Sequence, residues 1–92
     1  MNVKIQCFAQ LAHAAGAADH ELELSEGATA QDALRAFGRT TTKEACALLF
    51  TEDGELQPTI LLFLDEEPVL WSEPADARDG SNLFVATPIA GG

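Results

Sequence analysis

The sequence predicts an α+β fold, a mixed sheet of four to five strands packed against one main helix and one or two short helices. Three observations predict it. Apolar and polar residues alternate near both ends of the chain, a helix with one apolar face follows the first strands, and no repeat or linker divides the 92 residues. A chain of this length suits one domain. We expect that domain at residues 1–88, followed by a flexible tail at residues 89–92.

Two strands are predicted at the start of the chain. In "NVKIQCF", Val3, Ile5 and Cys7 fall on one side and polar residues on the other, the period of a half-buried strand. The alanine-rich "AQLAHAA" then predicts a short helix that ends at Gly16. "HELELS" alternates again, with its leucines inward and its glutamates outward. Because little chain separates the two strands, we expect an antiparallel pair.

The main helix is predicted over "TAQDALRAFG". Thr29 is its expected N-cap, and Asp32, three residues later, completes a capping-box pattern. Gly38 is the expected stop. The apolar residues recur at helical spacing and form one face: Ala30, Ala33, Leu34 and Phe37. "TTKEACALLF" predicts a second, shorter helix, with Thr41 and Glu44 as its capping box.

Three further strands are predicted in the second half. "EDGE" indicates a turn, and the apolar run "PTILLFL" predicts a central strand. "PVLW" favours a brief returning strand, but the preceding "DEEP" lacks the Asn/Gly pair that favours a tight hairpin. "ADARDG" is a further turn, "NLFVAT" is the last strand, and Pro88 ends its pairing because proline has no N–H.

The alternation in the last two long strands leaves apolar side chains on both sides of the sheet. If the residues at positions 60, 62, 64, 83 and 85 face the helix, three others face outward: Leu61, Phe63 and Phe84. Scattered exposed apolar residues are ordinary. A contiguous group beside the tail instead indicates a docking surface, which is the interpretation we favour because these strands are expected to be neighbours.

Charge and composition exclude several classes of function. Fifteen acidic against five basic residues give a formal charge of −10, which disfavours nucleic acid and favours a basic protein partner; the alternative is that the charge serves solubility alone. No run approaches the length of a membrane span, and no segment has the pattern of a signal peptide. With only two cysteines, a reducing cytoplasm is expected.

The remaining reactive residue types form no catalytic or metal-binding pattern. Cys7 and Cys46 are interpreted as small apolar packing residues, and His13 and His20 as surface or hydrogen-bonded side chains. Two cysteines and two histidines also lack the paired spacing of a structural zinc site. The acidic run at residues 65–67 is interpreted as an exposed turn.

The segment "TPIAGG", residues 87–92, raises the functional question. Its side chains shrink from Ile89 to Gly91 and Gly92, which suits threading into a narrow channel where a Cβ would collide with the walls. The carboxylate of Gly92 is unhindered, but a carboxylate must first be activated, typically as an acyl-adenylate, before it transfers. The alternative is that small residues are merely tolerated at a frayed chain end.

Several segments together resemble one known family. They are "VKIQCFAQLAHAAG", "GATAQDALRAF", "ILLFLDEEPV" and "ARDGSNLFVATPIAGG", which cover nearly the whole chain. The chain resembles the MoaD/ThiS family of ubiquitin-like, β-grasp sulfur carrier proteins. Its long middle, with "LFTEDGELQP", is more similar to MoaD-like members, including those used in cysteine synthesis, than to the shorter thiazole-type carriers. Thr87 stands where the family often has proline.

The resemblance implies a carrier and not an enzyme. A ubiquitin-activating-type partner uses ATP to adenylate the C-terminal glycine, a sulfur donor converts it to a thiocarboxylate, and a second partner takes the sulfur. No cofactor is bound by the chain itself. By motif, Gly92 is the modified residue and Gly91 its slender neighbour, while Ile89 and Ala90 enter the partner's channel. The outward strand residues suited to docking are Leu61, Phe63 and Phe84.

The sequence does not select the pathway. Our main hypothesis is the small subunit of molybdopterin synthase, which serves molybdenum cofactor biosynthesis. A first rival sends the sulfur to cysteine or to the thiazole of thiamine. A second joins Gly92 to lysines as a ubiquitin-like modifier, and a third is a β-grasp interaction module with an inert tail.

Overall fold

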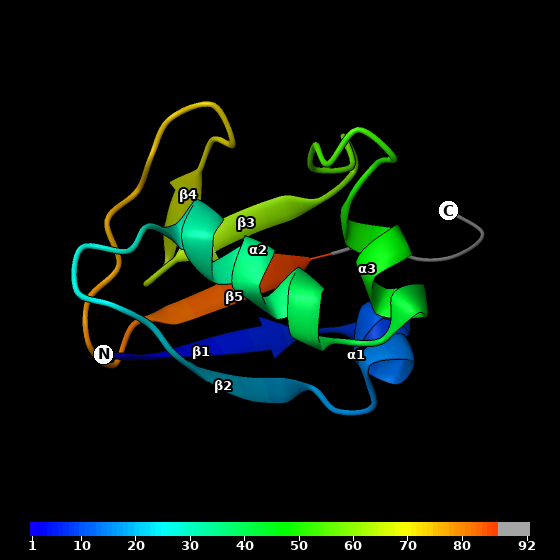
Figure 1. The fold of residues 1–92 in the computed structure, drawn as a ribbon, viewed down its shortest axis with the longest axis horizontal. Helices are drawn as coiled ribbons and strands as arrows, with labels where there is room; N and C mark the ends of the chain where they lie inside the picture. Colours follow the sequence, from blue (N-terminus) through cyan, green and yellow to red (C-terminus); the bar gives the residue numbers. More distant parts are fainter. Residues whose placement is uncertain (87–92) are drawn as a thin grey trace.

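A computed structural model of the protein describes residues 1–86 and contains five strands and three helices (Figure 1). The main helix is α2, and two short helices, α1 and α3, lie together at one end of the sheet. The predicted fold class is confirmed. In chain order the elements are β1 (Asn2–Cys7), α1 (Ala9–Ala15), β2 (Asp19–Glu23), α2 (Ala30–Thr40), α3 (Lys43–Leu49), β3 (Leu61–Leu64), β4 (Glu67–Val69) and β5 (Asn82–Ala86).

The sheet has the strand order β2-β1-β5-β3-β4. β1 and β5, the first and last strands, pair in parallel at its centre, and the other pairs are antiparallel. The expected antiparallel pair at the start of the chain is therefore confirmed, as is the pairing of the two long strands in the second half. The mixed sheet places the end of β5 between two neighbours, β1 and β3.

The core lies between the sheet and α2, which crosses the front of the sheet in Figure 1. Leu34 and Phe37 on α2 are buried, as predicted from their helical spacing. On the sheet, the inward side chains are also buried: Val3, Ile5, Cys7, Leu62, Leu64, Leu83 and Val85. Each large side chain removed from water in this way contributes roughly 1.5–3 kcal/mol. The alternation of apolar and polar residues therefore correctly predicted which strand residues face the core.

The start of α2 is capped as expected. The hydroxyl of Thr29 accepts the backbone N–H of Asp32 at 3.0 Å, and the Asp32 carboxylate accepts the N–H of Thr29 at 3.0 Å. Farther along the same helix, the buried amide of Gln31 donates to the carbonyl oxygens of Leu70 and Glu73. This amide ties the long connection before β5 to the helix.

Two predictions of helix ends were wrong. Gly38 does not stop α2, which runs on to Thr40; it lies inside the helix because the ring of Phe50 packs against it, and a Cβ there would lie 2.8 Å from that ring. The N-cap of α3 is Thr42, whose hydroxyl accepts the N–H of Ala45 at 3.1 Å, and not Thr41. The Thr41 hydroxyl is buried and has no hydrogen-bond partner among residues 1–86.

The turn between β3 and β4 is also tighter than the sequence indicated. Leu64 pairs with Glu67, so only Asp65 and Glu66 connect the strands. Both have positive φ, 50° and 73°, as a two-residue type I′ hairpin requires. Aspartate tolerates this conformation better than most residues. The tight hairpin, which the lack of an Asn/Gly pair in "DEEP" placed in doubt, therefore forms.

Candidate functional site

A contiguous aromatic surface covers the outer side of the sheet, opposite α2. We call it the aromatic face and define it by Phe8, Leu61, Phe63 and Phe84. The last three are the outward residues predicted from the alternation, and the structure brings them together. Leu61 is 60% exposed and Phe8 is 39% exposed, whereas the neighbouring Leu62 is buried. The strands therefore present a different set of side chains on each side.

The rings of the aromatic face are in direct contact. The ring centroids of Phe8 and Phe84 lie 4.3 Å apart in a stacked arrangement. The ring centroids of Phe63 and Phe84 lie 5.9 Å apart in an edge-to-face arrangement. Both distances lie near the range in which aromatic pairs attract beyond simple burial. Phe63 and Phe84 are also cross-strand partners of β3 and β5. The three rings thus form one cluster held by backbone pairing.

A hollow of about 310 Å³ adjoins the cluster, lined by Phe63, Glu66, Asn82 and Phe84. Two of its lining residues are aromatic, and Glu66 adds a carboxylate. An apolar lining with an acidic group suits an apolar side chain flanked by a basic group, which matches the expected basic partner.

Polar contacts from the β3–β4 hairpin fix the position of this hollow. The Asp65 carboxylate accepts the hydroxyl of Ser81 at 2.7 Å and the backbone N–H of Asn82 at 2.9 Å. The Asp65 N–H donates in turn to the Asn82 carbonyl oxygen at 2.9 Å. The Asn82 amide donates to the Gln6 side-chain oxygen at 3.1 Å. One aspartate therefore joins the hairpin to the start of β5, just before Phe84.

The sequence predicted neither Phe8 as part of the aromatic face nor the polar contacts that Asp65 makes with Ser81 and Asn82. Phe8 follows Cys7 and so falls on the outward side by the same alternation that placed Val3 inward. Its proximity to Phe84 depends on the parallel pairing of β1 with β5, in which Gln6 is opposite Phe84. The role of Asp65 depends on the tight two-residue turn, which the sequence placed in doubt.

The aromatic face adjoins the end of β5, which precedes the expected tail in the sequence. Ala86, the last described residue, pairs with Leu61 across β5 and β3. The other predicted site residues lie outside the described residues: Ile89, Ala90, Gly91 and Gly92. The boundaries expected for the domain and the tail lie there too.

The other reactive residue types occupy ordinary positions. Cys7 is buried in the core, and burial, together with the nearby charge of Asp19, raises the pKa of its thiol to about 11. The ring centroids of His20 and Phe37 lie 4.9 Å apart. The Nε2 atom of His20 is 2.9 Å from the carbonyl oxygen of Ala17. Within residues 1–86, no group of three metal-ligating side chains converges, and no helix is both long and apolar enough to cross a bilayer.

Comparison with known proteins finds similarity in structure. No family model and no curated protein matches the chain. The crystal structure of SAMP1 from Haloferax volcanii matches with a TM-score of 0.89 and 27% identity, over 100% of both chains.

Two more distant structures share the fold. A Pyrococcus furiosus protein assigned as molybdopterin converting factor subunit 1 has a TM-score of 0.71 at 24% identity, over 97% of this chain and 99% of that one. A chain of the Amycolatopsis orientalis BexX/CysO complex has a TM-score of 0.66 at 21% identity, over 98% of this chain and 99% of that one.

These neighbours confirm the resemblance to the MoaD/ThiS family of ubiquitin-like, β-grasp sulfur carriers, and they confirm the β-grasp fold. Their identities to this chain, 21–27%, accompany a likeness of fold over nearly the whole length of both chains. The neighbours do not select a pathway within that family.

Proposed function

We propose that the protein is a sulfur carrier whose C-terminal carboxylate, on Gly92, becomes a thiocarboxylate. In the first step the Gly92 carboxylate attacks the α-phosphorus of ATP, which releases pyrophosphate and leaves an acyl-adenylate. In the second step hydrosulfide from a sulfur donor attacks the acyl carbon. The C–S bond forms as the C–O bond to AMP breaks, and the thiocarboxylate remains. The activating partner binds the ATP, and this chain contributes only the carboxylate and the surface by which it is held.

The observation that carries the proposal is the position of the aromatic face beside the end of β5, which precedes the expected tail in the sequence. Leu61 of that face pairs with Ala86, only a few residues before Gly92. A partner that covers the aromatic rings therefore has the tail within reach, since six extended residues span about 20 Å. Ile89 and Ala90 would enter the partner's channel ahead of Gly91 and Gly92.

We further propose molybdopterin synthesis as the pathway, in which the chain is the small subunit and a larger subunit accepts its sulfur. The likeness to the converting factor subunit from Pyrococcus furiosus supports this choice. Sulfur transfer to cysteine or thiazole synthesis would use the same tail. The site of action that fits these reactions is the cytoplasm.

A second candidate function is favoured by a different observation. The Haloferax volcanii SAMP1 structure, whose sequence is 27% identical, superposes on the whole chain, and another structure of that organism bears the name small archaeal modifier protein 1. A modifier would use the same acyl-adenylate but would join Gly92 to a lysine amine in an amide bond. The two functions therefore differ only in the group that attacks the acyl carbon.

Intact-mass measurement tests these proposals. The purified chain is incubated with ATP, a sulfur donor and a cognate activating enzyme, and we expect the mass gain that corresponds to one oxygen replaced by sulfur. The matched control is a chain with one residue added after Gly92, which should fold normally and gain nothing. Covalent adducts on other proteins would favour the modifier. An unchanged mass, under conditions where a known carrier reacts, would refute both candidates.

A further inference from the structure

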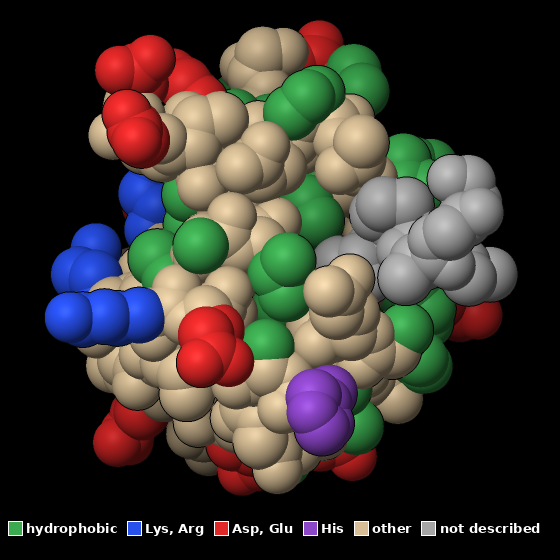
Figure 2. All heavy atoms as spheres, turned by 90° about the vertical axis from the view of Figure 1, so that its right-hand side faces the viewer, with side chains coloured by type: hydrophobic (Ala, Val, Ile, Leu, Met, Phe, Trp, Pro, Cys, Tyr) green, Lys and Arg blue, Asp and Glu red, His purple; other side chains and the backbone are tan. Residues whose placement is uncertain are grey.

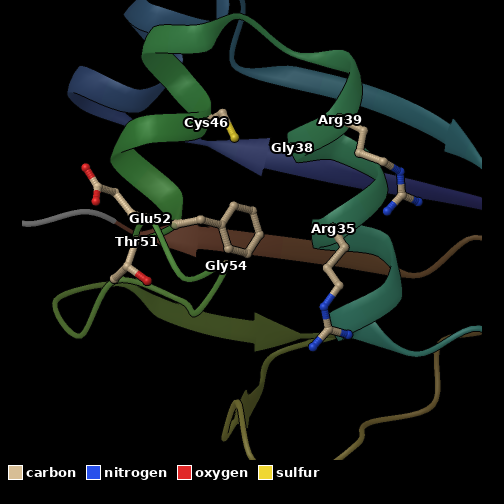
Figure 3. A pocket seen from close by; sticks show the side chains of 8 residues that line it. Arg35, Gly38, Arg39, Cys46, Thr51, Glu52 and Gly54 are labelled. Atoms are coloured by element: carbon tan, nitrogen blue, oxygen red, sulfur yellow. The ribbon is translucent and has the colours of Figure 1, made fainter.

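A second hollow, of about 320 Å³, lies on the helical side of the protein, between α2 and the segment that follows α3 (Figure 3). Gly38, Cys46 and Phe50 line its apolar part, and Arg35, Arg39 and Glu52 line its rim. In Figure 3, Cys46 on α3 faces Gly38 on α2, and the two arginines extend from α2. The sulfur-carrier function proposed above does not use this surface.

The apolar part of this hollow depends on a glycine inside a helix. Glycine destabilises a helix interior relative to alanine. Here a Cβ at Gly38 would lie 2.8 Å from the ring of Phe50 and 3.8 Å from the sulfur of Cys46. The glycine therefore lets the Phe50 ring lie directly on the helix backbone.

One arginine at the rim is held in place by an aromatic stack. The guanidinium carbon of Arg35 lies 4.8 Å from the ring centre of Trp71, and the Trp71 ring is 5.9 Å from that of Phe50. A guanidinium stacked on an aromatic face keeps N–H groups at its edge free to donate to a carboxylate. Since the side chain is already restrained, binding an anion loses less rotamer freedom.

The charge around the hollow is unusual for this chain. Only five residues are basic, against fifteen acidic ones, yet three of the five lie on α2 and α3: Arg35, Arg39 and Lys43. Figure 2 shows Lys and Arg side chains gathered at one edge of the face seen there, below a group of Asp and Glu side chains. The basic group is thus a local exception on an acidic molecule.

The two arginines also carry an unfavourable interaction within the free protein. Arg35 and Arg39 are four residues apart on α2, and like charges at this spacing repel. Asp32, one turn earlier, offsets part of this, but its carboxylate already accepts the N–H of Thr29. An anion bound between the two guanidinium groups would remove the repulsion. At the opposite rim, the Glu52 carboxylate points away from the arginines (Figure 3).

We propose that this hollow binds a short acidic segment of a partner protein, in which an aromatic or large aliphatic side chain lies beside one or two carboxylates. The apolar side chain packs on Phe50 and Gly38, and the carboxylates accept hydrogen bonds from Arg35 and Arg39. Bidentate carboxylate–guanidinium pairing gives the site its selectivity. A partner could then occupy this side while the aromatic face and the tail remain available to another.

Nuclear magnetic resonance titration of the full chain tests the proposal. The probe is a short synthetic peptide with one phenylalanine flanked by glutamates. We expect saturable shifts of backbone amides in the second half of α2 and in residues 46–54. Peptides with lysines in place of the glutamates, or with alanine in place of phenylalanine, should bind at least about tenfold more weakly, because each removes one half of the recognition.

Matched arginine variants complete the experiment. Arg35→Gln and Arg39→Gln should each weaken peptide binding about tenfold. Arg78→Gln makes the same change of charge away from the hollow, and should change binding less than about twofold because only weak, screened attraction is lost. Equal losses in all three variants would overturn the proposal. So would shifts that map to the aromatic face, no binding at millimolar peptide, or shifts explained by self-association.

This outcome is independent of the sulfur-carrier proposal. Arg35→Gln should acquire sulfur like the natural chain, because Arg35 lies on α2, on the opposite side of the sheet from the aromatic face. A chain extended beyond Gly92 should still bind the peptide. Failure of the peptide experiment therefore leaves the tail chemistry untouched, and the reverse also holds.

Discussion

The two sides of strands β3 and β5 have different chemistry, although they come from alternate residues of the same strands. The inner side is aliphatic and closed, with Leu62 at 3% and Leu83 at 0% exposure. The outer side is aromatic and open, with Phe63 and Phe84 in edge-to-face contact and Leu61 at 60% exposure. The inner side therefore carries most of the folding free energy, whereas the outer side is available for recognition.

The two sides also differ in what fixes their side chains. On the inner side, close packing against α2 leaves each side chain little freedom. On the outer side, position is set by strand pairing and by the polar contacts of Asp65 with Ser81 and Asn82. Because strand pairing and these polar contacts already order the outer surface, its side chains lose less conformational freedom when a partner binds.

Substitution of adjacent leucines gives the largest expected contrast. Leu62→Ala removes a buried side chain and should lower the free energy of unfolding by about 2–5 kcal/mol, because a cavity remains in the core. Leu61→Ala, one residue away, should change it by less than about 0.5 kcal/mol. Urea unfolding measures both values. Similar losses of unfolding free energy in the two variants would show that both sides of the sheet contribute equally to stability.

The Leu61→Ala variant should instead weaken binding to the sulfur-accepting partner proposed above, because it truncates an exposed residue of the aromatic face. Titration calorimetry with that partner provides the measurement. Binding as tight as that of the natural chain would show that Leu61 does not contribute to the proposed docking surface.

Substitution of Asp32, in the capping box at the start of α2, should have a smaller, pH-dependent effect on stability. The N–H of Thr29, and then the charges of Arg35 and Arg39, hold the pKa of Asp32 below its usual value. A carboxyl with a lowered pKa stabilises the fold above its unfolded pKa, about 3.9, and loses that effect as the pH falls through its folded pKa. Asp32→Asn should therefore lower stability by about 0.3–1 kcal/mol at neutral pH.

Thermal unfolding at several pH values checks this expectation. The difference between the natural chain and Asp32→Asn should shrink as the pH falls below the unfolded pKa of aspartate and through the lower folded pKa of Asp32, because the natural carboxyl then becomes neutral. Thr29→Ala serves as the matched control, since it removes the hydroxyl half of the capping box without removing a charge. A penalty for Asp32→Asn that does not vary with pH would contradict the assignment.

Two opposing effects on stability are expected when Gly38 is replaced by alanine. Alanine gains about 1 kcal/mol of helix propensity, but its Cβ must displace the ring of Phe50, so the net change should stay within about 1 kcal/mol. Because Phe50 packs against Trp71, the only tryptophan, the fluorescence of Trp71 should change. Unchanged emission would mean that the ring does not move.

Most of the fold was predictable because it follows from short-range patterns. The period of two in β1, β3 and β5 separated inner from outer residues, and the period of the helix identified Leu34 and Phe37 as core. The outward positions of Leu61, Phe63 and Phe84 followed from the same alternation. These patterns need no knowledge of which strands are neighbours.

The failures came from contacts between residues far apart in sequence. Gly38 was read as a stop because glycine usually ends helices, but Phe50, twelve residues later, occupies the space that the missing Cβ leaves. The hairpin at Asp65 lacks glycine and is held instead by bonds to Ser81 and Asn82. Phe8 joined the aromatic face only through pairing with β5. Local sequence carries no signal of these partners.

The central place of β5 also affects how the protein is made. This strand is the last of the five to be synthesised, yet it joins β1 on one side to β3 on the other. A nascent chain that ends before Asn82 would have two half-sheets with nothing between them, and each would expose a row of unpaired backbone groups. Completion of the sheet therefore waits until residues 82–86 have been synthesised, after the other four strands are already present.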